Sequence, residues 1–559
     1  MYVLDFKGKK HFFSPAFKVT RKFKDICTSA YFLEIKFFAD SQVECVVLER
    51  KLLAEKFMSH LLEKGFWLSA TPVNEVTLAE ILMEQSNSVS LSMCHTKLGY
   101  QIWQGNAYYF GDSEISGTLD STYVGNQEFS NSNAFCEWQN FTNELVKDTP
   151  LLALPLAMGV SAPVATRLKN AGLTDETALW ALIGVSSSGK TTSLKLAASA
   201  WGKPSGDGVI DNLTGTEKYF FASLADREGW PNFIDETSAV TWDFTKAIYT
   251  VALSREGGRC NPDGTPKKRK NWSGAVIFTG ETSMFHRTNG NSGLHARLVE
   301  FDFRWFDNGE LPDKISRFVS HNYGTAWMQY IPYLQSLDDL ALTSLFDDKV
   351  AEIKKKLALR AGFDEETWET KVFNGIQNRI IKKLALLLLS VDTMLKAWNL
   401  DVDCKKVVEY ILDTYDHNAS RIDKIDEFRE NFVQHIARYR DSFPDVRSGG
   451  LDLSTVSSAR GFQDRHKQRN CVWVLASEFD QELFKHGLDA SPSTLKELHN
   501  RGIIEHFGDR YKKIYRTGKI APTCYCFYQD SGNIAPPKSK NKKNKKKKMS
   551  KQLKSLLEE

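Results

Sequence analysis

The stretch Gly184-Val-Ser-Ser-Ser-Gly-Lys-Thr-Thr192 decides the fold of the central part of this chain. It fits the pattern G-x-x-x-x-G-K-[ST] without a mismatch. An apolar run at 178–183 precedes it and suits a buried strand, and a run of helix-forming residues at 192–201 follows it. A strand, a glycine-containing loop and a helix in this order predict a loop that binds phosphate groups, whereas a chance match in an ordinary loop would not need this context.

The residue types in the stretch suit a nucleoside triphosphate. Gly184 and Gly189 permit backbone angles that turn successive N–H groups toward a phosphate, and the helix N-terminus adds partial positive charge. The Lys190 ammonium can reach the β- and γ-phosphates, and the Thr191 hydroxyl can ligate Mg²⁺. We therefore predict that ATP is bound by Gly184, Val185, Ser186, Ser187, Ser188, Gly189, Lys190, Thr191 and Thr192.

An acidic pair, Asp235-Glu236, follows the short segment 231–234. Such a pair is expected at the end of a strand beside the loop. Asp235 would hold the metal, directly or through water, together with Thr191. Glu236 would orient and activate the attacking water, which is the work of a general base. A solvated acidic turn is the plainer alternative.

Two further catalytic candidates lie beyond the acidic pair. Thr279 stands near the end of an apolar run at 274–279, where it could sense the γ-phosphate, although a plain strand end fits as well. Arg297 stands just before an expected strand at 298–303 and could stabilise transition-state charge on the nucleotide of a neighbouring subunit. We favour Arg297 over Arg287 for this role, and either could instead be a structural ion-pair residue.

A basic segment separates the acidic pair from the strand of Thr279. It contains Asn261-Pro-Asp-Gly264, which is a turn by its chemistry, and then four consecutive basic residues. In a ring of subunits this segment would project toward the axis, where it could contact the backbone of a DNA strand. The candidate contacts are Arg259, Lys267, Lys268, Arg269 and Lys270. An exposed charged loop without a partner is the alternative.

The rest of the chain predicts an α/β protein with several domains. Residues 1–150 form an α+β module with strands at 31–38 and 44–49, helices near 50–65 and 77–85, and loops through 99–135. Residues 151–310 alternate strands with helices, which is typical of a parallel sheet and here predicts a P-loop NTPase core. Residues 311–445 are helical, notably at 376–398 and 405–417. Residues 446–530 suggest a winged-helix-like module with helices at 476–486 and 491–500 and strands at 503–507 and 524–528.

Composition narrows the class of protein further. The 559 residues are 42% hydrophobic and 25% charged, which excludes collagen-like and wholly disordered classes. Nine cysteines without a CxxC pair suggest neither a zinc ribbon nor a thioredoxin-type site, so we expect a cytoplasmic protein. The longest apolar runs, at 151–160 and 384–391, are shorter than the roughly 20 residues of a membrane helix. We therefore expect no membrane partner.

The net charge of +4 conceals a basic tail. Residues 531–559 contain ten Lys and two Glu, which leaves the rest of the chain at −4. This segment cannot bury itself and is predicted to be a disordered polycation. It could contact nucleic-acid phosphates or merely aid solubility.

Together these motifs resemble the family called domain of unknown function 927 (DUF927), helicase-like ATPases of prophages and other mobile elements. The resemblance rests on residues 184–201, 233–237, 255–259 with the basic run after them, 278–281 and 296–301, and it extends over roughly residues 1–305. It implies an AAA+ type core similar to ring-forming replicative helicases. It also implies that Lys190, Asp235, Glu236 and Arg297 match the family's positions.

We therefore expect an ATPase that binds ATP and Mg²⁺, assembles into a ring of identical subunits and moves or remodels DNA, as a DNA helicase or translocase. Two alternatives remain. One is an ATP-gated oligomeric switch, for example in phage defence, although Glu236 argues for hydrolysis. The other is a replication initiator that binds an origin through its winged-helix-like end.

Overall fold

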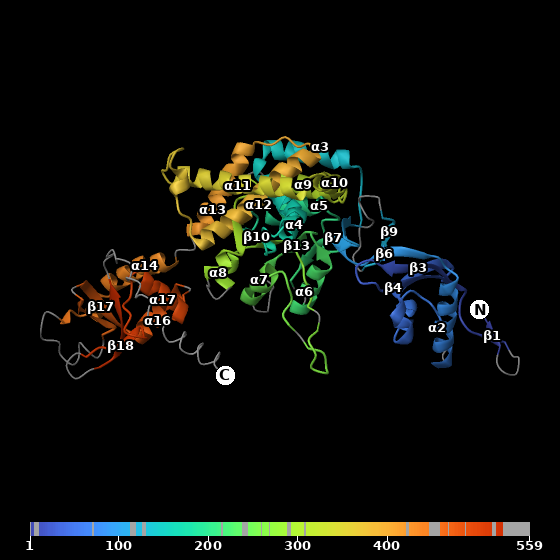
Figure 1. Cartoon of the computed structure of the whole chain (residues 1–559), viewed down its shortest axis with the longest axis horizontal. Coiled ribbons are helices and arrows are strands. Elements are labelled where there is room, and N and C mark those ends of the chain that lie inside the picture. The colour runs from blue at the N-terminus through green and yellow to red at the C-terminus, as the bar shows by residue number, and fades with distance from the viewer. Residues whose placement is uncertain are drawn as a thin grey trace, which may run out of the picture. The chain divides into compact units, whose positions relative to one another are not determined.

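The computed structural model describes residues 2–4, 10–69, 72–111, 119–125, 130–213, 216–237, 244–258, 260–267, 269–287, 292–306, 309–420, 424–446, 459–467, 469–486, 488–516 and 521–528. Its contacts divide the chain into two compact units, Met1–Ser420 and Arg421–Glu559, and each is described by itself (Figure 1). The predicted mixed α/β organisation is confirmed. The predicted basic tail at 531–559 lies outside the described residues.

The first unit begins with a five-stranded sheet. Its strand order is β5 (Gln42–Glu49), β4 (Tyr31–Ala39), β3 (Phe17–Asp25), β6 (Leu91–His95) and β9 (Ser121–Tyr123). Alternate residues Leu33, Ile35 and Phe37 enter a hydrophobic core, as the period of a strand requires. The accompanying elements are the strand pair β1 (Tyr2–Leu4) and β2 (Lys10–Phe12), the 3₁₀ helix η1 (Arg50–Ala54), α1 (Met58–Leu62) and α2 (Pro72–Asn87).

Two local predictions for this region are wrong. Residues 50–65 form η1 and α1 and not one helix, because burial of Phe57, Met58 and Leu61 in the sheet's core overrides their helical spacing. Loops do not run through the whole of 99–135, since the described residues of this range include β7 (Leu98–Trp103), β8 (Asn106–Phe110) and β9. Gly99 allows β7 and β12 to approach closely, because a Cβ at this position would lie 1.8 Å from the Glu228 carbonyl oxygen.

The β7–β8 hairpin joins this N-terminal part to the centre of the first unit. β7 pairs with the short strand β12 (Arg227–Glu228), and the Tyr109 hydroxyl donates a 2.8 Å hydrogen bond to the Gly229 carbonyl. Trp230 stacks on Tyr109 and makes edge contacts with Trp201 and Trp327, with ring centroids 5.0–6.0 Å apart. These buried aromatic rings fix the hairpin against the central domain.

The central domain is built on a five-stranded parallel sheet. Its order is β11 (Ile210–Asn212), β13 (Asn232–Asp235), β14 (Ala275–Gly280), β10 (Ala178–Ile183) and β15 (Leu298–Asp302). Every residue of β10 and β14 is buried, which explains why both strands read as continuous apolar runs. The order places β14 between the strand that precedes the 184–192 loop and the strand that ends at Asp235.

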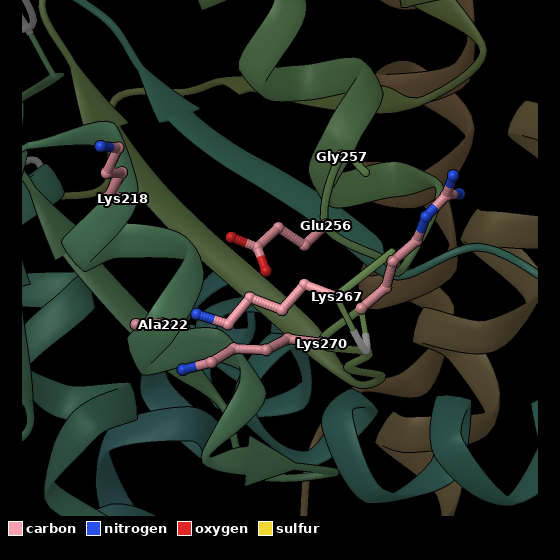
Figure 2. A pocket seen from close by; sticks show the side chains of 7 residues that line it. Lys218, Ala222, Glu256, Gly257, Lys267 and Lys270 are labelled. Atoms are coloured by element: carbon pink, nitrogen blue, oxygen red, sulfur yellow. The ribbon is translucent and has the colours of Figure 1, made fainter. Parts of the chain in front are cut away.

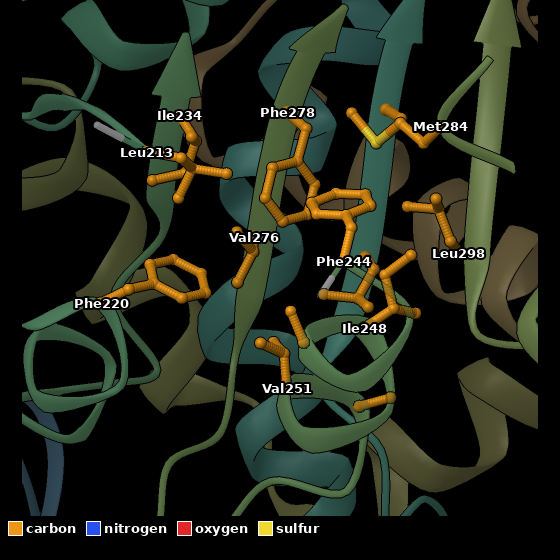
Figure 3. Packing of buried hydrophobic residues seen from close by; sticks show 14 of the residues in the cluster. Leu213, Phe220, Ile234, Phe244, Ile248, Val251, Val276, Phe278, Met284 and Leu298 are labelled. Atoms are coloured by element: carbon orange, nitrogen blue, oxygen red, sulfur yellow. The ribbon is translucent and has the colours of Figure 1, made fainter. Parts of the chain in front are cut away.

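Helices cover both faces of this sheet. On one face, α6 (Glu217–Ala225) and α7 (Phe244–Ala252) pack against alternate residues such as Val276 and Phe278 (Figure 3). On the other face lie α4 (Ala153–Asn170) and α5 (Lys190–Ser199), where Ser161 of α4 accepts a 3.0 Å hydrogen bond from the Trp180 indole. The sheet is therefore a buried layer between two helical layers.

Helix α4 continues the apolar run predicted at 151–160. Among the described residues, one helical segment, Pro150–Asn170, is long and apolar enough to cross a membrane, and its most apolar window is buried entirely inside the protein. Such burial is typical of a core helix. Arg167, near its end, donates hydrogen bonds to the Leu334 and Leu337 carbonyls and pairs with Asp339.

A group of helices completes the first unit (Figure 1). Its elements are α3 (Phe135–Asp148), η2 (Pro150–Leu152), η4 (Met284–Arg287), α8 (Ser292–His295), α9 (Glu310–Val319), α10 (Trp327–Ser336), α11 (Asp339–Arg360), η5 (Trp368–Thr370), α12 (Gly375–Trp398) and α13 (Cys404–Ser420). The predicted helices at 376–398 and 405–417 correspond to α12 and α13. Asn374 and Gln377 form a capping box at the start of α12, which fixes that helix end.

The second unit contains a four-stranded antiparallel sheet ordered β16 (Gly461–His466), β17 (Arg469–Leu475), β19 (Thr523–Tyr528) and β18 (Lys512–Ile514). Its helical elements are α14 (Lys424–Arg438), η7 (Arg440–Ser442), α16 (Ala476–Lys485) and α17 (Pro492–Asn500). The predicted helices at 476–486 and 491–500 and the strand at 524–528 are present. The strand predicted at 503–507 is replaced by isolated bridges of Ile504 and Phe507, because this segment meets only the end of β19 and a tight turn.

Candidate functional site

The 184–192 loop connects the carboxyl end of β10 to α5, as the sequence predicts. Gly184, Ser187 and Gly189 have positive φ angles of 143°, 62° and 91°. A Cβ on Gly189 would lie 2.1 Å from the Phe306 ring, so glycine is required there by space as well as by angle. The left-handed Ser187 was not predicted, because no residue pattern distinguishes it from its serine neighbours.

The Lys190 side chain folds back over this loop. Its ammonium group donates hydrogen bonds to the carbonyl oxygens of Gly184 (2.9 Å) and Val185 (2.8 Å), with the Ser188 hydroxyl at 3.3 Å. The side chain is buried, so its positive charge is held within the loop. A buried cation among main-chain dipoles is suited to an anionic ligand.

Three polar side chains meet beside the loop, one from the first turn of α5 and two from the carboxyl ends of β13 and β14. The Thr191 hydroxyl donates to Oδ1 of Asp235 at 3.1 Å, and the buried Thr279 hydroxyl donates to the same oxygen at 2.5 Å. β13, β14 and β10 are parallel neighbours, so their carboxyl ends lie at one edge of the sheet. The structure therefore brings together Thr191, Asp235 and Thr279, which are far apart in the sequence.

Glu236 is held at this edge by its main chain. Its N–H donates a 2.9 Å hydrogen bond to the Thr279 hydroxyl, and its φ is +57°, a conformation that glutamate rarely adopts. The next residue, Thr237, donates to the Thr279 carbonyl at 3.0 Å. The side chain of Glu236 is exposed beside Asp235. Strain of about 1–3 kcal/mol at such a position is common in functional sites, where surrounding contacts impose it.

The segment that follows β15 closes one side of the loop. The Trp305 N–H donates a 3.0 Å hydrogen bond to the Ser188 carbonyl, and the Phe306 ring lies against Gly189. The Asp302 carboxylate lies near Gly184, at 3.6 Å from an ideal Cβ on that glycine. Sequence reasoning missed these residues. The only available signal was the aromatic pair Trp305-Phe306 soon after the strand predicted at 298–303.

The donor set at this edge fits a nucleoside triphosphate with Mg²⁺. A threonine hydroxyl and a carboxylate are the hard oxygen ligands that Mg²⁺ prefers, and Thr191 and Asp235 already share a hydrogen bond. Lys190 and the positive-φ loop provide the cationic surroundings that phosphates require. The side chains of Thr191 and Glu236 are exposed, so both can be reached from outside.

Arg297 lies at the amino-terminal ends of the parallel strands, opposite the ends that carry the 184–192 loop. It directly precedes β15, and the first residues of that strand pair with the amino-terminal half of β10, away from the 184–192 loop. Its guanidinium lies over the Tyr249 ring of α7, at 4.6 Å from the centroid. It is therefore not placed to contact a ligand in its own loop. The side chain of Arg287, the other candidate, lies outside those that the structure describes.

Arg297 belongs to a cluster of charged side chains at the amino-terminal ends of the strands. The buried ammonium of Lys383 lies 3.1 Å from the Glu176 carboxylate. Burial lowers the pKa of Lys383, the Glu176 carboxylate opposes this change, and the nearby positive charges of Arg297 and Arg379 add to the lowering. This cluster therefore contains more positive than negative groups.

The basic segment forms an antiparallel hairpin before β14. Its two sides are joined by bridges from Arg255 to Asn271 and from Cys260 to Pro266. The Gly264 N–H donates a 3.0 Å hydrogen bond to the Asn261 carbonyl at the tip, which confirms the predicted turn. The candidates Lys267, Arg269 and Lys270 follow the tip, whereas Arg259 and Lys268 lie outside the described residues.

Comparison with known protein families finds a match for the part of the chain that holds the 184–192 loop. Residues 6–271 match the family described as "Domain of unknown function (DUF927)". This part of the chain is similar to the DUF927 family. The resemblance inferred from the motifs is confirmed over this range, which holds the loop, the acidic pair and most of the basic hairpin but ends before β14 and Arg297.

A second likeness extends beyond the residues that match the DUF927 model. A solved structure described as "SCCmec type IV Cch - active helicase" matches 94% of this chain and 97% of its own chain, with a TM-score of 0.72 and 22% sequence identity. Both the part that matches the DUF927 model and the residues after it thus share the fold of that protein. None of the curated proteins compared with the chain matches it.

Proposed function

We propose that this chain is an Mg²⁺-dependent ATPase that uses ATP hydrolysis to move along or remodel DNA, as a helicase or translocase of a mobile element. The observation that carries the proposal is the meeting of Thr191, Asp235 and Thr279 beside the loop that holds Lys190. The fold shared with a protein described as an active helicase supports the direction of the proposal.

Each residue at the loop edge has a role in the proposed reaction. Bound Mg–ATP supplies the phosphoanhydride that is cleaved and the divalent charge that stabilises the phosphate oxygens. Lys190 leaves its carbonyl partners to bind phosphate oxygens, while Thr191 and Asp235 hold the metal. Glu236 accepts a proton from the attacking water. Thr279 orients Asp235 through its hydroxyl and fixes the main chain of Glu236.

The position of Arg297 favours action between subunits. It lies at the sheet edge away from the loop of its own chain, among other cationic groups. A subunit that presents this edge to the loop of a neighbour would place Arg297 near that neighbour's phosphates. We therefore propose a ring-shaped homo-oligomer in which Arg297 acts in trans.

The finer domain description is also part of this proposal. We assign residues 151–310 to an AAA+ P-loop core, 311–420 to a helical lid and the second unit to a winged-helix-like module. The boundary expected at 445 is moved to 420 because Phe428, Phe432 and Ile436 of α14 share the hydrophobic core of the second unit. The parallel sheet and the loop between β10 and α5 support the first assignment. The helices α16 and α17 followed by the antiparallel pair β18–β19 support the last.

The test is ATP turnover by the full chain and by a chain that ends at residue 530, each with and without single-stranded DNA. Removal of the basic tail separates a response of the proposed motor from ionic attraction. We expect Mg²⁺-dependent turnover that DNA stimulates in both chains. Turnover that DNA leaves unchanged in both would contradict a DNA motor and would favour an ATP-gated switch.

A replication initiator is the second candidate, and the second unit favours it. Lys512 and Lys513 lie in β18, which pairs with β19 in an antiparallel hairpin that could act as a basic wing. An initiator would bind one duplex sequence far more tightly than others, whereas a translocase would show little preference. Binding of the full chain to a library of duplexes distinguishes the two.

A further inference from the structure

A pocket lies between α6 and the basic hairpin of the first unit (Figure 2). Lys218 and Ala222 line it from α6, and Glu256, Lys267 and Lys270 line it from the hairpin. Arg269 also contributes to its wall. Figure 2 shows the ammonium ends of Lys267 and Lys270 directed toward the side of α6, with the Glu256 carboxylate beside them. Four cationic side chains thus surround a single carboxylate.

The positive charge in the pocket exceeds the negative charge that the described residues bring to it: Glu256 lines the pocket, and the Asp226 carboxylate interacts electrostatically with Lys270. None of Lys218, Lys267, Arg269 and Lys270 makes an ion pair with another described residue within 4.0 Å. The neighbouring α6 residue Glu217 is paired with Lys246 of α7 at 3.2 Å. Gathered cations that repel one another are stabilised by an external anion, and a pocket of this kind is suited to one.

The hairpin holds these side chains in a fixed arrangement. The Glu256 N–H donates a 2.9 Å hydrogen bond to the Lys270 carbonyl, so the two residues face each other across the ladder. The Arg269 guanidinium packs near Gly258, where a Cβ would lie 2.9 Å from one of its nitrogens. At the base of the ladder, Lys169 of α4 donates to the Trp272 carbonyl at 2.9 Å. The pocket is therefore partly ordered before any ligand binds.

We propose that this pocket binds a backbone phosphate of single-stranded DNA, with Lys218 of α6 as a binding residue in addition to the hairpin, and with Glu256 as a negative charge that opposes phosphate binding. This inference rests on the proposed DNA motor and adds α6 to its contact surface. A phosphodiester fits because lysine and arginine side chains bind phosphate oxygens irrespective of base sequence. The Glu256 carboxylate lines the same pocket, so it would repel the phosphate and weaken its binding.

The proposal is tested by fluorescence anisotropy with a labelled oligothymidylate and the full chain at several salt concentrations. The variant Lys218→Ala removes the α6 cation, and Lys396→Ala removes an exposed helical lysine of the same unit that does not line the pocket. We expect Lys218→Ala to raise the Kd about fivefold and to reduce the salt slope by about 0.7, which corresponds to one phosphate contact on a single strand. Lys218→Arg should retain most of the affinity.

The Glu256→Gln variant tests whether the negative charge of Glu256 opposes phosphate binding. Removal of its negative charge should lower the Kd for the oligonucleotide, and the gain should disappear when Lys218→Ala is combined with it. Thermal unfolding is measured for every variant to check that it folds. Tighter binding by Glu256→Gln that persists in the double variant would overturn the pairing of these two residues in one pocket.

Further outcomes separate this inference from the proposed function. If the unaltered chain binds DNA but Lys218→Ala behaves like Lys396→Ala, the α6 contact is wrong while the DNA motor stands. If the unaltered chain does not bind DNA, the proposed function fails first. Displacement of the oligonucleotide by inorganic phosphate at constant ionic strength would identify a small-anion site and would overturn the assignment to DNA.

Discussion

The Thr279 hydroxyl donates a 2.5 Å hydrogen bond to Oδ1 of Asp235, the oxygen that also accepts from Thr191 at 3.1 Å. The same hydroxyl accepts the N–H of Glu236 at 2.9 Å. One buried threonine thereby fixes both the orientation of the metal-binding candidate and the main chain of the general-base candidate. Its effect on the proposed reaction is indirect and depends on the hydroxyl rather than on the size of the side chain.

Replacement of Thr279 by valine preserves the shape of the side chain but removes the hydroxyl. Asp235 then loses a donor and the Glu236 N–H loses its acceptor. We expect ATP turnover to fall about hundredfold, the lower end of what general acid–base catalysis contributes. Thr279→Ser keeps the hydroxyl and should retain most of the turnover. Steady-state turnover together with unfolding temperature checks this, and equal losses in the two variants would contradict a role for the hydroxyl.

Substitutions of Lys190 and Glu236 should block different steps of the proposed reaction. Lys190→Ala removes the loop's cation, so we expect nucleotide binding and turnover to be lost. Glu236→Gln keeps the size and polarity of the side chain but cannot accept a proton, so it should bind nucleotide and accumulate oligomers without turnover. Nucleotide titration and sedimentation measure both steps. Normal turnover by Lys190→Ala would refute the loop assignment, and normal turnover by Glu236→Gln would remove its catalytic role.

The hairpin offers a prediction about stimulation by DNA. Neutral replacement of Lys267 and Lys270 removes two of the cations that line the pocket beside α6. Because each phosphate contact adds to affinity, the ratio of DNA-stimulated to unstimulated turnover should fall several-fold at moderate salt. Turnover over a range of DNA concentrations measures this ratio. An unchanged ratio would transfer the DNA contact elsewhere, for example to the basic tail.

Sequence reasoning located the loop-edge residues because local rules determine them. A strand, a G-x-x-x-x-G-K-T loop and a helix are consecutive in the chain, and parallel strands end at one edge of their sheet. Asp235 and Thr279 could therefore be expected near Thr191 without knowledge of the contacts. The structure adds that Thr279 mediates between the acidic residues, which spacing along the sequence does not reveal.

The missed features depend on segments distant in the chain. Phe306 lies against Gly189 only because β15 is the neighbour of β10, and Lys218 approaches the hairpin only because α6 packs on the same sheet face. Local spacing also failed at residues 50–65, where burial of apolar side chains breaks a helical pattern into two pieces. In each case tertiary packing overrides or supplements local preference.

Gly189 should tolerate no side chain. Alanine at this position would combine an unfavourable φ of +91° with a Cβ 2.1 Å from the Phe306 ring. Gly172→Ala is a matched control, since Gly172 has a φ of +78° but no atom within 4 Å of an added Cβ. The control should cost about 1–2 kcal/mol through backbone strain alone. We expect Gly189→Ala to cost more and to lose nucleotide affinity, as measured by chemical unfolding and titration. Equal losses of stability in Gly189→Ala and Gly172→Ala would show that the Phe306 ring can move away from an added Cβ at no cost in free energy.

Glu505 should make the stability of the second unit depend on pH. Burial tends to raise the pKa of this carboxyl, but hydrogen bonds from Lys467, Tyr528 and the His506 N–H outweigh burial and lower the pKa to about 2. A depressed folded-state pKa stabilises the fold above the ordinary value of 4.5, and this contribution is lost as the pH falls toward 2. Glu505→Gln should therefore lower stability by about 2 kcal/mol at pH 7, the scale of a hydrogen bond to a charged group.

Calorimetric unfolding of the full chain between pH 3 and pH 7 checks this pH dependence. The gap between the unaltered chain and Glu505→Gln should narrow as the pH falls below about 4.5. In this range the Glu505 carboxyl is protonated in the unfolded chain but still ionised in the folded chain, so uptake of a proton favours unfolding. Asp509→Asn, which changes an exposed carboxylate of the same unit, should follow the unaltered chain at every pH. A gap that stays constant over this range would mean that the Glu505 charge does not stabilise the fold.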